Sequence, residues 1–123
     1  MITEKTGTYE HLVETADKQI GCFHKELIEL NDDLADHPEV GTKEYRTSQK
    51  MTELLKAKGY RVEYPFAGLD TAYRAVYGNN DHKYKIAVLA EYDALPEIGH
   101  ACGHCLSGCI SILAGLALKD VQD

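Results

Sequence analysis

Apolar residues in the first third of the chain recur at intervals of three and four. This is the period of one face of a helix, and the residues that carry it are Leu12, Ala16, Ile20, Phe23, Leu27, Leu30 and Leu34. The pattern predicts a long helix from residue 9 to about residue 34. Pro38 is expected to end it, because a proline disfavours a helical conformation in the residue before it.

A second helix is predicted between residues 42 and 59. Thr42 is suited to the N-cap position, and Gly59 stands where a helix commonly ends on a glycine. The residues of this segment that we expect to be buried are Tyr45, Met51, Leu54 and Leu55.

Strand patterns follow. Tyr60, Val62 and Tyr64 alternate with polar residues, which predicts a half-exposed strand. Residues 71–77 predict a second strand, followed by a turn at residues 78–81. Residues 86–90 are apolar without interruption, as in a central strand covered on both faces.

The last predicted helix, about residues 103–118, has almost no polar face. A helix that is apolar all round is normally buried on several sides, so this segment belongs to a larger domain or is covered by a partner. Residues 105–118 are expected to be too short, and too interrupted by serine and glycine, to span a bilayer. The predicted class is α/β, with two N-terminal helices, a hairpin, a central strand and a C-terminal helix.

Composition narrows the function. A chain of 123 residues is long enough for one domain with a core. Its net charge of -7, without a cluster of Lys or Arg, argues against nucleic acid as a partner. Four cysteines and no apolar leader after Met1 predict reduced thiols and a cytoplasmic location, and no membrane partner is expected.

Candidate chemistry gathers between the predicted central strand and the last helix. Cys102 and His104 are two residues apart, so a tight turn can aim both at one metal ion. Asp93 is close enough in sequence to orient an imidazole from behind. A catalytic zinc needs about three protein ligands and a water, so further ligands and a base would have to come from elsewhere.

Two other interpretations of this segment remain open. Residues 102–105 spell Cys-Gly-His-Cys, which in a thiol–disulfide oxidoreductase opens a helix. Against it, Ala101 replaces the usual aromatic residue, and only eighteen residues follow Cys105, too few for the rest of a thioredoxin fold. A structural zinc site made of His100, Cys102, His104 and Cys105 is disfavoured, because such sites take ligands from separated segments.

Longer motifs resemble a known family. Residues 91–96 (Glu-Tyr-Asp-Ala-Leu-Pro) and residues 99–104 (Gly-His-Ala-Cys-Gly-His) resemble the signature of the zinc amidohydrolase and aminoacylase family, in particular its p-aminobenzoyl-glutamate hydrolase and dipeptidase branch. Residues 36–41, with Glu44 and Thr47, resemble its N-terminal segment, and residues 69–78 resemble its first hairpin. The likeness covers nearly the whole chain, in order.

This resemblance implies a mixed-sheet, zinc-peptidase-like catalytic domain of which residues 1–123 are the N-terminal portion, without the dimerisation domain. It implies two divalent metals, zinc or manganese, and hydrolysis of an amide bond in an N-acyl amino acid, dipeptide or p-aminobenzoyl-glutamate. By position, Cys102 matches the bridging ligand and His104 a second ligand, while Asp93 and His100 support them.

The resemblance has two departures. Cys105 stands where the family usually has Asn or Asp, and the chain ends before the family's catalytic glutamate and later metal ligands. It is therefore expected to be inactive alone. The rival hypothesis is a non-catalytic binding or assembly module that contacts a partner through its apolar last helix. A second copy of the chain is one such partner, which would make a homo-oligomer.

Overall fold

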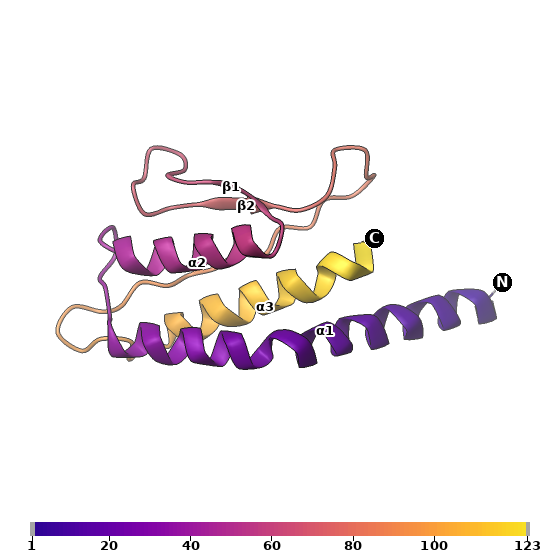
Figure 1. The fold of residues 1–123 in the computed structure, drawn as a ribbon, viewed down its shortest axis with the longest axis horizontal. Helices are drawn as coiled ribbons and strands as arrows, with labels where there is room; N and C mark the ends of the chain where they lie inside the picture. Colours follow the sequence, from indigo (N-terminus) through magenta and orange to yellow (C-terminus); the bar gives the residue numbers. More distant parts are fainter. Residues whose placement is uncertain (1, 123) are drawn as a thin grey trace.

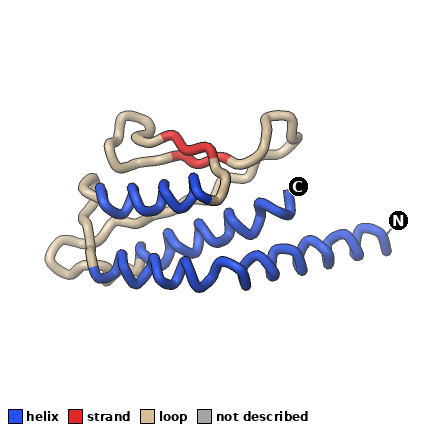
Figure 2. The backbone as a smooth tube through the Cα atoms, in the orientation of Figure 1, coloured by secondary structure: helices blue, strands red, loops and turns tan. Residues whose placement is uncertain are grey.

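The computed structural model describes the backbone of residues 2–122 and the side chains of residues 8–121. Its elements are α1 (Ile2–Asp36), α2 (Tyr45–Ala57), β1 (Arg61–Glu63), β2 (Arg74–Val76) and α3 (His104–Gln122). α1 and α3 lie side by side, α2 covers them, and the hairpin forms the outer layer (Figures 1 and 2). The predicted α/β class, the three helices and the hairpin are confirmed.

The two ends of α2 differ in how well the sequence predicts them. Thr42 is not the N-cap, because its φ is 67° and the helix begins at Tyr45. The side chain of Glu39 takes this role instead, since its carboxylate accepts the backbone N–H groups of Arg46 (3.0 Å) and Thr47 (2.6 Å). At the other end Gly59 has a φ of 93°, as predicted for a terminal glycine.

The predicted central strand is not formed. Residues 84–90 join no β-ladder, and Tyr84, Ile86 and Leu89 are 74%, 77% and 85% exposed. A buried strand needs neighbours on its edges and layers on its faces. Within residues 2–122 the one sheet is the two-stranded hairpin, which this segment does not join. The sequence pattern therefore predicts a covered strand, and none of the described residues pairs with this segment as a neighbouring strand.

The core lies where α1, α2 and α3 meet. Its buried residues are Leu27, Leu34, Met51, Leu55, Cys105, Cys109, Ile112 and Leu116. Of the other buried candidates on α2, Leu54 packs against this core, whereas Tyr45 is 49% exposed. Cys109 belongs to this core, whereas the thiol of Cys22 is exposed.

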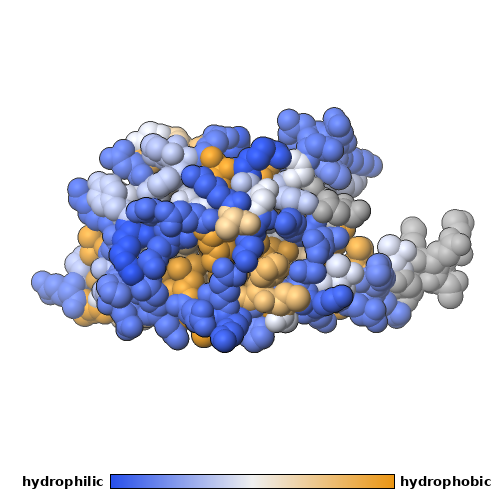
Figure 3. Space-filling model, viewed as in Figure 1, coloured by the Kyte–Doolittle hydropathy of each residue, from blue (hydrophilic) through white to orange (hydrophobic). Residues whose placement is uncertain are grey.

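α3 buries only one of its apolar sides. Cys105, Cys109, Ile112 and Leu116 face the core, while Leu106 and Ile110 are 52% and 57% exposed. Apolar side chains accordingly reach the surface over α1 and α3 in the space-filling view (Figure 3).

The helix is also longer than predicted. Residues His104–Val121 are long and apolar enough to cross a membrane, so the expected shortness of this segment is wrong. A third of the stretch is buried in the fold. Core helices of soluble proteins meet the same criteria, so this observation does not assign the helix to a membrane.

Candidate functional site

The site is built where residues 90–94 cross the first turns of α3. The carbonyl oxygen of Glu91 lies against Gly108, and the hydroxyl of Ser111 donates to the carbonyl of Leu89 at 2.6 Å. On the other side, the N–H of Ala94 donates to the carbonyl of Glu39 at 2.7 Å. These contacts hold residues 89–94, which include Glu91 and Asp93, between the start of α2 and the start of α3.

His104 is the first residue of α3, and two carboxylates meet its ring. Its Nδ1 lies 2.6 Å from Oδ1 of Asp93, and its Nε2 lies 3.4 Å from Oε2 of Glu91. The hydrogen bond to Asp93 raises the pKa of His104 above its usual value, with smaller contributions from the charges of Asp93 and Glu91. A carboxylate bonded to Nδ1 keeps the proton of the neutral imidazole on that nitrogen. The lone pair of Nε2 is then available to bind a metal ion.

Cys102 is exposed and precedes His104 by two residues. Both side chains belong to the described residues, and no hydrogen bond joins them. Among the described residues no group of three or more His, Cys, Asp or Glu side chains is arranged to hold a metal ion. The structure thus brings Asp93 and Glu91 onto His104, and no described hydrogen bond joins Cys102 to any of the three.

The other thiols are removed from this surface. Cys105 and Cys109 are buried in the core, and burial raises the pKa of Cys105 and takes the pKa of Cys109 to about 12. All four cysteines are free, so residues 102 and 105 are not joined as a disulfide.

His100 has an unusual environment. Both of its ring nitrogens are buried, and neither has a hydrogen-bond partner among the described residues. Burial lowers the pKa of His100, opposed by the nearby charge of Asp93. Leaving a buried polar group unpaired costs about 1–3 kcal/mol, and residues 8–121 supply no partner for either nitrogen of His100.

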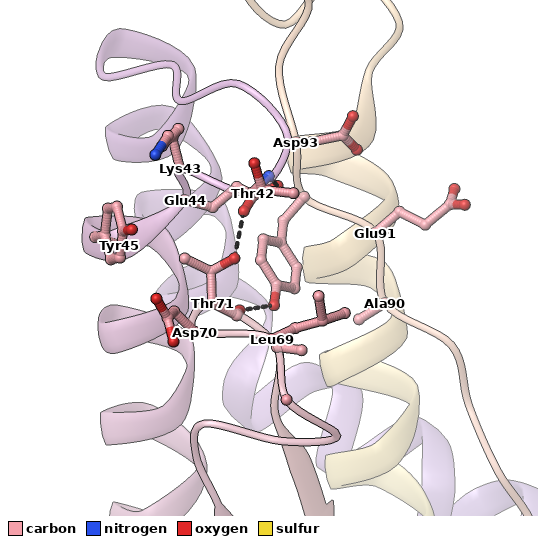
Figure 4. A pocket seen from close by; sticks show the side chains of 13 residues that line it. Thr42, Lys43, Glu44, Tyr45, Leu69, Asp70, Thr71, Ala90, Glu91 and Asp93 are labelled. Atoms are coloured by element: carbon pink, nitrogen blue, oxygen red, sulfur yellow. Dashed lines mark hydrogen bonds between the residues drawn. The ribbon is translucent and has the colours of Figure 1, made fainter.

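A hollow beside the site contains residues that the sequence motifs did not single out as site residues. Glu44 is 7% exposed, and it accepts the hydroxyl of Thr71 at 2.6 Å and the N–H of Thr42 at 3.0 Å. The hydroxyl of Tyr92 donates to the carbonyl of Thr71, which closes the network (Figure 4). Glu44 lies in the N-terminal segment that resembles the amidohydrolase family, and this resemblance is the sequence signal that could have identified it as a site residue.

The other histidines whose contacts the structure describes, His24 and His37, do not contact this region. Nδ1 of His24 bonds the carbonyl of Gly21, and Nδ1 of His37 bonds the carbonyl of Asp33, both on α1. His24 lies on α1 and His37 directly follows it, and both are exposed.

The donor chemistry fits part of a divalent-metal centre. A histidine oriented by a carboxylate is the usual form of a metal-bound imidazole, and a thiol two residues away is a suitable second ligand. Two ligands are fewer than the three of a catalytic zinc. The described residues therefore contain fewer ligands than such a centre requires.

Known proteins support the family resemblance at a coarse level. No family model matches the chain. It is 31% identical over 126 residues to the Xaa-Arg dipeptidase of Mus musculus, covering 95% of this chain and 29% of that protein.

Two bacterial proteins give similar values. The chain is 28% identical to one subunit of the p-aminobenzoyl-glutamate hydrolase of Escherichia coli, over 84% of this chain and 24% of that protein. It is 30% identical to N-acetyl-L-cysteine deacetylase of Bacillus subtilis, over 85% and 28%. The chain spans less than a third of each of these relatives, which are named for hydrolysis of amide or peptide bonds, and the similarities point to an amidohydrolase or peptidase family.

Proposed function

We propose that this chain supplies one side of a divalent-metal centre that hydrolyses an amide bond in a small peptide or N-acyl amino acid. The observation that carries the proposal is the 2.6 Å contact between Nδ1 of His104 and Asp93 at the start of α3. The names of the relatives support the reaction class, and the fold supports the placement of the residues.

In this proposal Cys102 and His104 hold the ion, which is zinc or manganese. When bound, the ion supplies Lewis-acid polarisation of the scissile carbonyl. Asp93 keeps the His104 ring in one orientation and one tautomer, so that Nε2 stays available. Glu91, which is 67% exposed and 3.4 Å from Nε2, balances the positive charge of the imidazole when the ion is absent.

The described residues lack a third ligand arranged with these two. A carboxylate base and further ligands would come from additional polypeptide, and the 123 residues alone are expected to show no turnover. Mixing the chain with N-acyl amino acids, dipeptides or p-aminobenzoyl-glutamate in the presence of zinc or manganese tests this expectation. Clear metal-dependent hydrolysis would contradict it.

Cobalt binding tests the ligand assignment without requiring activity. Co²⁺ added to the chain is expected to give a thiolate-to-metal charge-transfer absorption, because Cys102 is an exposed thiol two residues before His104. Cys102→Ser should abolish this absorption, and His104→Ala should weaken Co²⁺ binding. Cys105→Ser and Cys22→Ser are the matched controls and should retain it.

The same variants separate the proposal from thiol–disulfide chemistry. A metal site needs Cys102 and not Cys105, whereas a dithiol mechanism needs both. If Cys105→Ser abolishes the absorption, or if no cobalt binds, the ligand assignment fails. Reduction of insulin by the wild-type chain, lost in either cysteine variant, would instead support the oxidoreductase interpretation.

A further inference from the structure

Glu44 is a buried carboxylate without a cationic partner. It is 7% exposed, and none of the ion pairs among residues 8–121 includes it. A carboxylate is costly to bury unless hydrogen bonds replace those it made to water. Oε1 of Glu44 accepts the N–H of Thr42 at 3.0 Å, and Oε2 accepts the hydroxyl of Thr71 at 2.6 Å. The carboxylate therefore joins the turn before α2 to the residues that precede β2.

The turn that Glu44 closes lies against the carboxylate of the site. Thr42 has a φ of 67°, a backbone conformation that residues other than glycine rarely adopt. Its N–H is the group that Glu44 accepts, so this hydrogen bond stabilises the turn in that conformation. A Cβ atom added at Gly41 would lie 3.9 Å from Oδ2 of Asp93 and 3.9 Å from Oε1 of Glu44. The turn thus passes close to both carboxylates.

The two chain neighbours of Asp93 are both held by these elements. On one side, the hydroxyl of Tyr92 donates to the carbonyl of Thr71, the residue whose hydroxyl bonds the buried carboxylate (Figure 4). On the other side, the N–H of Ala94 donates to the carbonyl of Glu39, where the turn begins, at 2.7 Å. Buried polar networks whose members are hydrogen-bonded make the structure around them rigid. The backbone that carries Asp93 is therefore fixed at both ends.

We propose that Glu44 is a positioning residue for the Asp93–His104 pair. Its two hydrogen bonds join the turn to Thr71, and together these elements hold Oδ1 of Asp93 at 2.6 Å from Nδ1 of His104. The contacts that carry this inference lie within residues 39–104. The inference rests on the proposed function only for the use of Nε2 of His104 as a metal ligand.

The tautomer of His104 tests this role without a metal. Nitrogen NMR, at a pH where the ring is neutral, shows which ring nitrogen carries the proton, and the spectrum of His104→Ala identifies the resonances. The wild-type ring should carry its proton on Nδ1. Glu44→Ala should give a mixture of the two tautomers, because Asp93 is no longer held in place.

Glu44→Gln distinguishes the hydrogen bonds of Glu44 from its charge. The amide oxygen can accept the N–H of Thr42, and the amide nitrogen can donate to the hydroxyl of Thr71. This variant should therefore restore most of the wild-type tautomer. If Glu44→Gln behaves like Glu44→Ala, the charge of Glu44 acts on the site and the positioning role is overturned.

Variants of Thr71 keep the test decisive if Glu44→Ala does not fold. Thr71→Val removes the hydroxyl that bonds Glu44 and should give the same mixture of tautomers, whereas Thr71→Ser keeps the hydroxyl and should retain the wild-type tautomer. Thr52→Val is the matched control, because Thr52 is 1% exposed and its hydroxyl bonds the carbonyl of Gln49 within α2. It should lower stability in urea and leave the tautomer unchanged. An equal change of tautomer in Thr52→Val would mean that any loosening of the core suffices, and would overturn the proposal.

Cobalt binding separates this inference from the proposed function. Thr71→Val should weaken Co²⁺ binding by about tenfold, the lower end of the loss that follows when support for a metal ligand is removed. Thr52→Val should bind Co²⁺ as the wild type does. A wild-type chain that binds no cobalt overturns the ligand assignment, while the tautomer of His104 still decides the role of Glu44. If that tautomer is the same in the wild type, Glu44→Ala and Thr71→Val, the role of Glu44 is overturned whatever the cobalt result.

Discussion

Gly108 of α3 lies directly against the carbonyl oxygen of Glu91. A Cβ atom added at residue 108 would stand 2.5 Å from that oxygen and 3.0 Å from Cε of Met51. The methionine side chain can move, whereas the carbonyl belongs to the backbone that carries the acidic residues of the site. The absence of a side chain at this position therefore decides how close that segment lies to α3.

Gly108→Ala is expected to destabilise the fold by about 1–3 kcal/mol, because the backbone of residues 89–93 must shift to admit the methyl group. Urea unfolding measures the loss. Gly21→Ala is the control, since Gly21 lies in α1 with nothing within 4 Å of the added Cβ. That variant should gain about 0.5–1 kcal/mol from helix propensity. Equal effects of the two substitutions would contradict the close approach.

Asp93→Asn is expected to lower the pKa of His104 towards that of an ordinary histidine. The carboxylate of Asp93 raises the pKa of His104 chiefly through their hydrogen bond, and the amide carries no charge to maintain this effect. An NMR titration of the imidazole resonances measures the change. An unaltered His104 titration would show that the contact is not formed in solution.

Asp33 is expected to make stability fall at acid pH. Hydrogen bonds from Arg46 and Lys50 hold the pKa of this carboxyl at about 2, below its ordinary 3.8. A carboxyl with a lowered pKa in the folded state stabilises it fully above pH 3.8, and this contribution is lost as the pH falls towards 2.

Asp33→Asn should remove this part of the pH dependence, which lies between about pH 5 and pH 2. The side chain is 28% exposed, so the effect is modest and should shrink in about 1 M salt. Thermal unfolding at a series of pH values makes the comparison. If the wild type and the variant lose stability in parallel below about pH 4, the ion pairs contribute nothing in solution.

Local patterns predicted the helices and the His104–Asp93 pair. The periodicity of α1 and the glycine after α2 are consequences of neighbouring residues, and the short spacing from Asp93 to His104 restricts where the two can lie. Residues 84–90 show the limit of this reasoning. Their apolar run encodes a strand, but a strand forms only where another strand pairs with it, and none of the described residues does so.

The start of α2 was mispredicted because its cap is supplied from six residues before the helix. Thr42 fits the local rule, yet Glu39 accepts the N–H groups of Arg46 and Thr47 as well as the Thr47 hydroxyl at 2.7 Å. A cap at this separation depends on how residues 39–44 turn. That turn is fixed partly by the Ala94 N–H, which lies far along the chain and bonds the Glu39 carbonyl.

Glu39→Ala is expected to lower the free energy of unfolding by about 1–2 kcal/mol, because it leaves two helix N–H groups and a buried hydroxyl without their acceptor. Glu39→Gln should cost less, since the amide oxygen still accepts a hydrogen bond. Urea unfolding gives both values. Glu53→Ala, an exposed glutamate of α2 bonded only to Gln49, is the control and should change stability little. A loss at residue 39 no larger than that at residue 53 would mean that the backbone of α2 is capped by water, and the turn that joins α2 to the site would then lack its anchor.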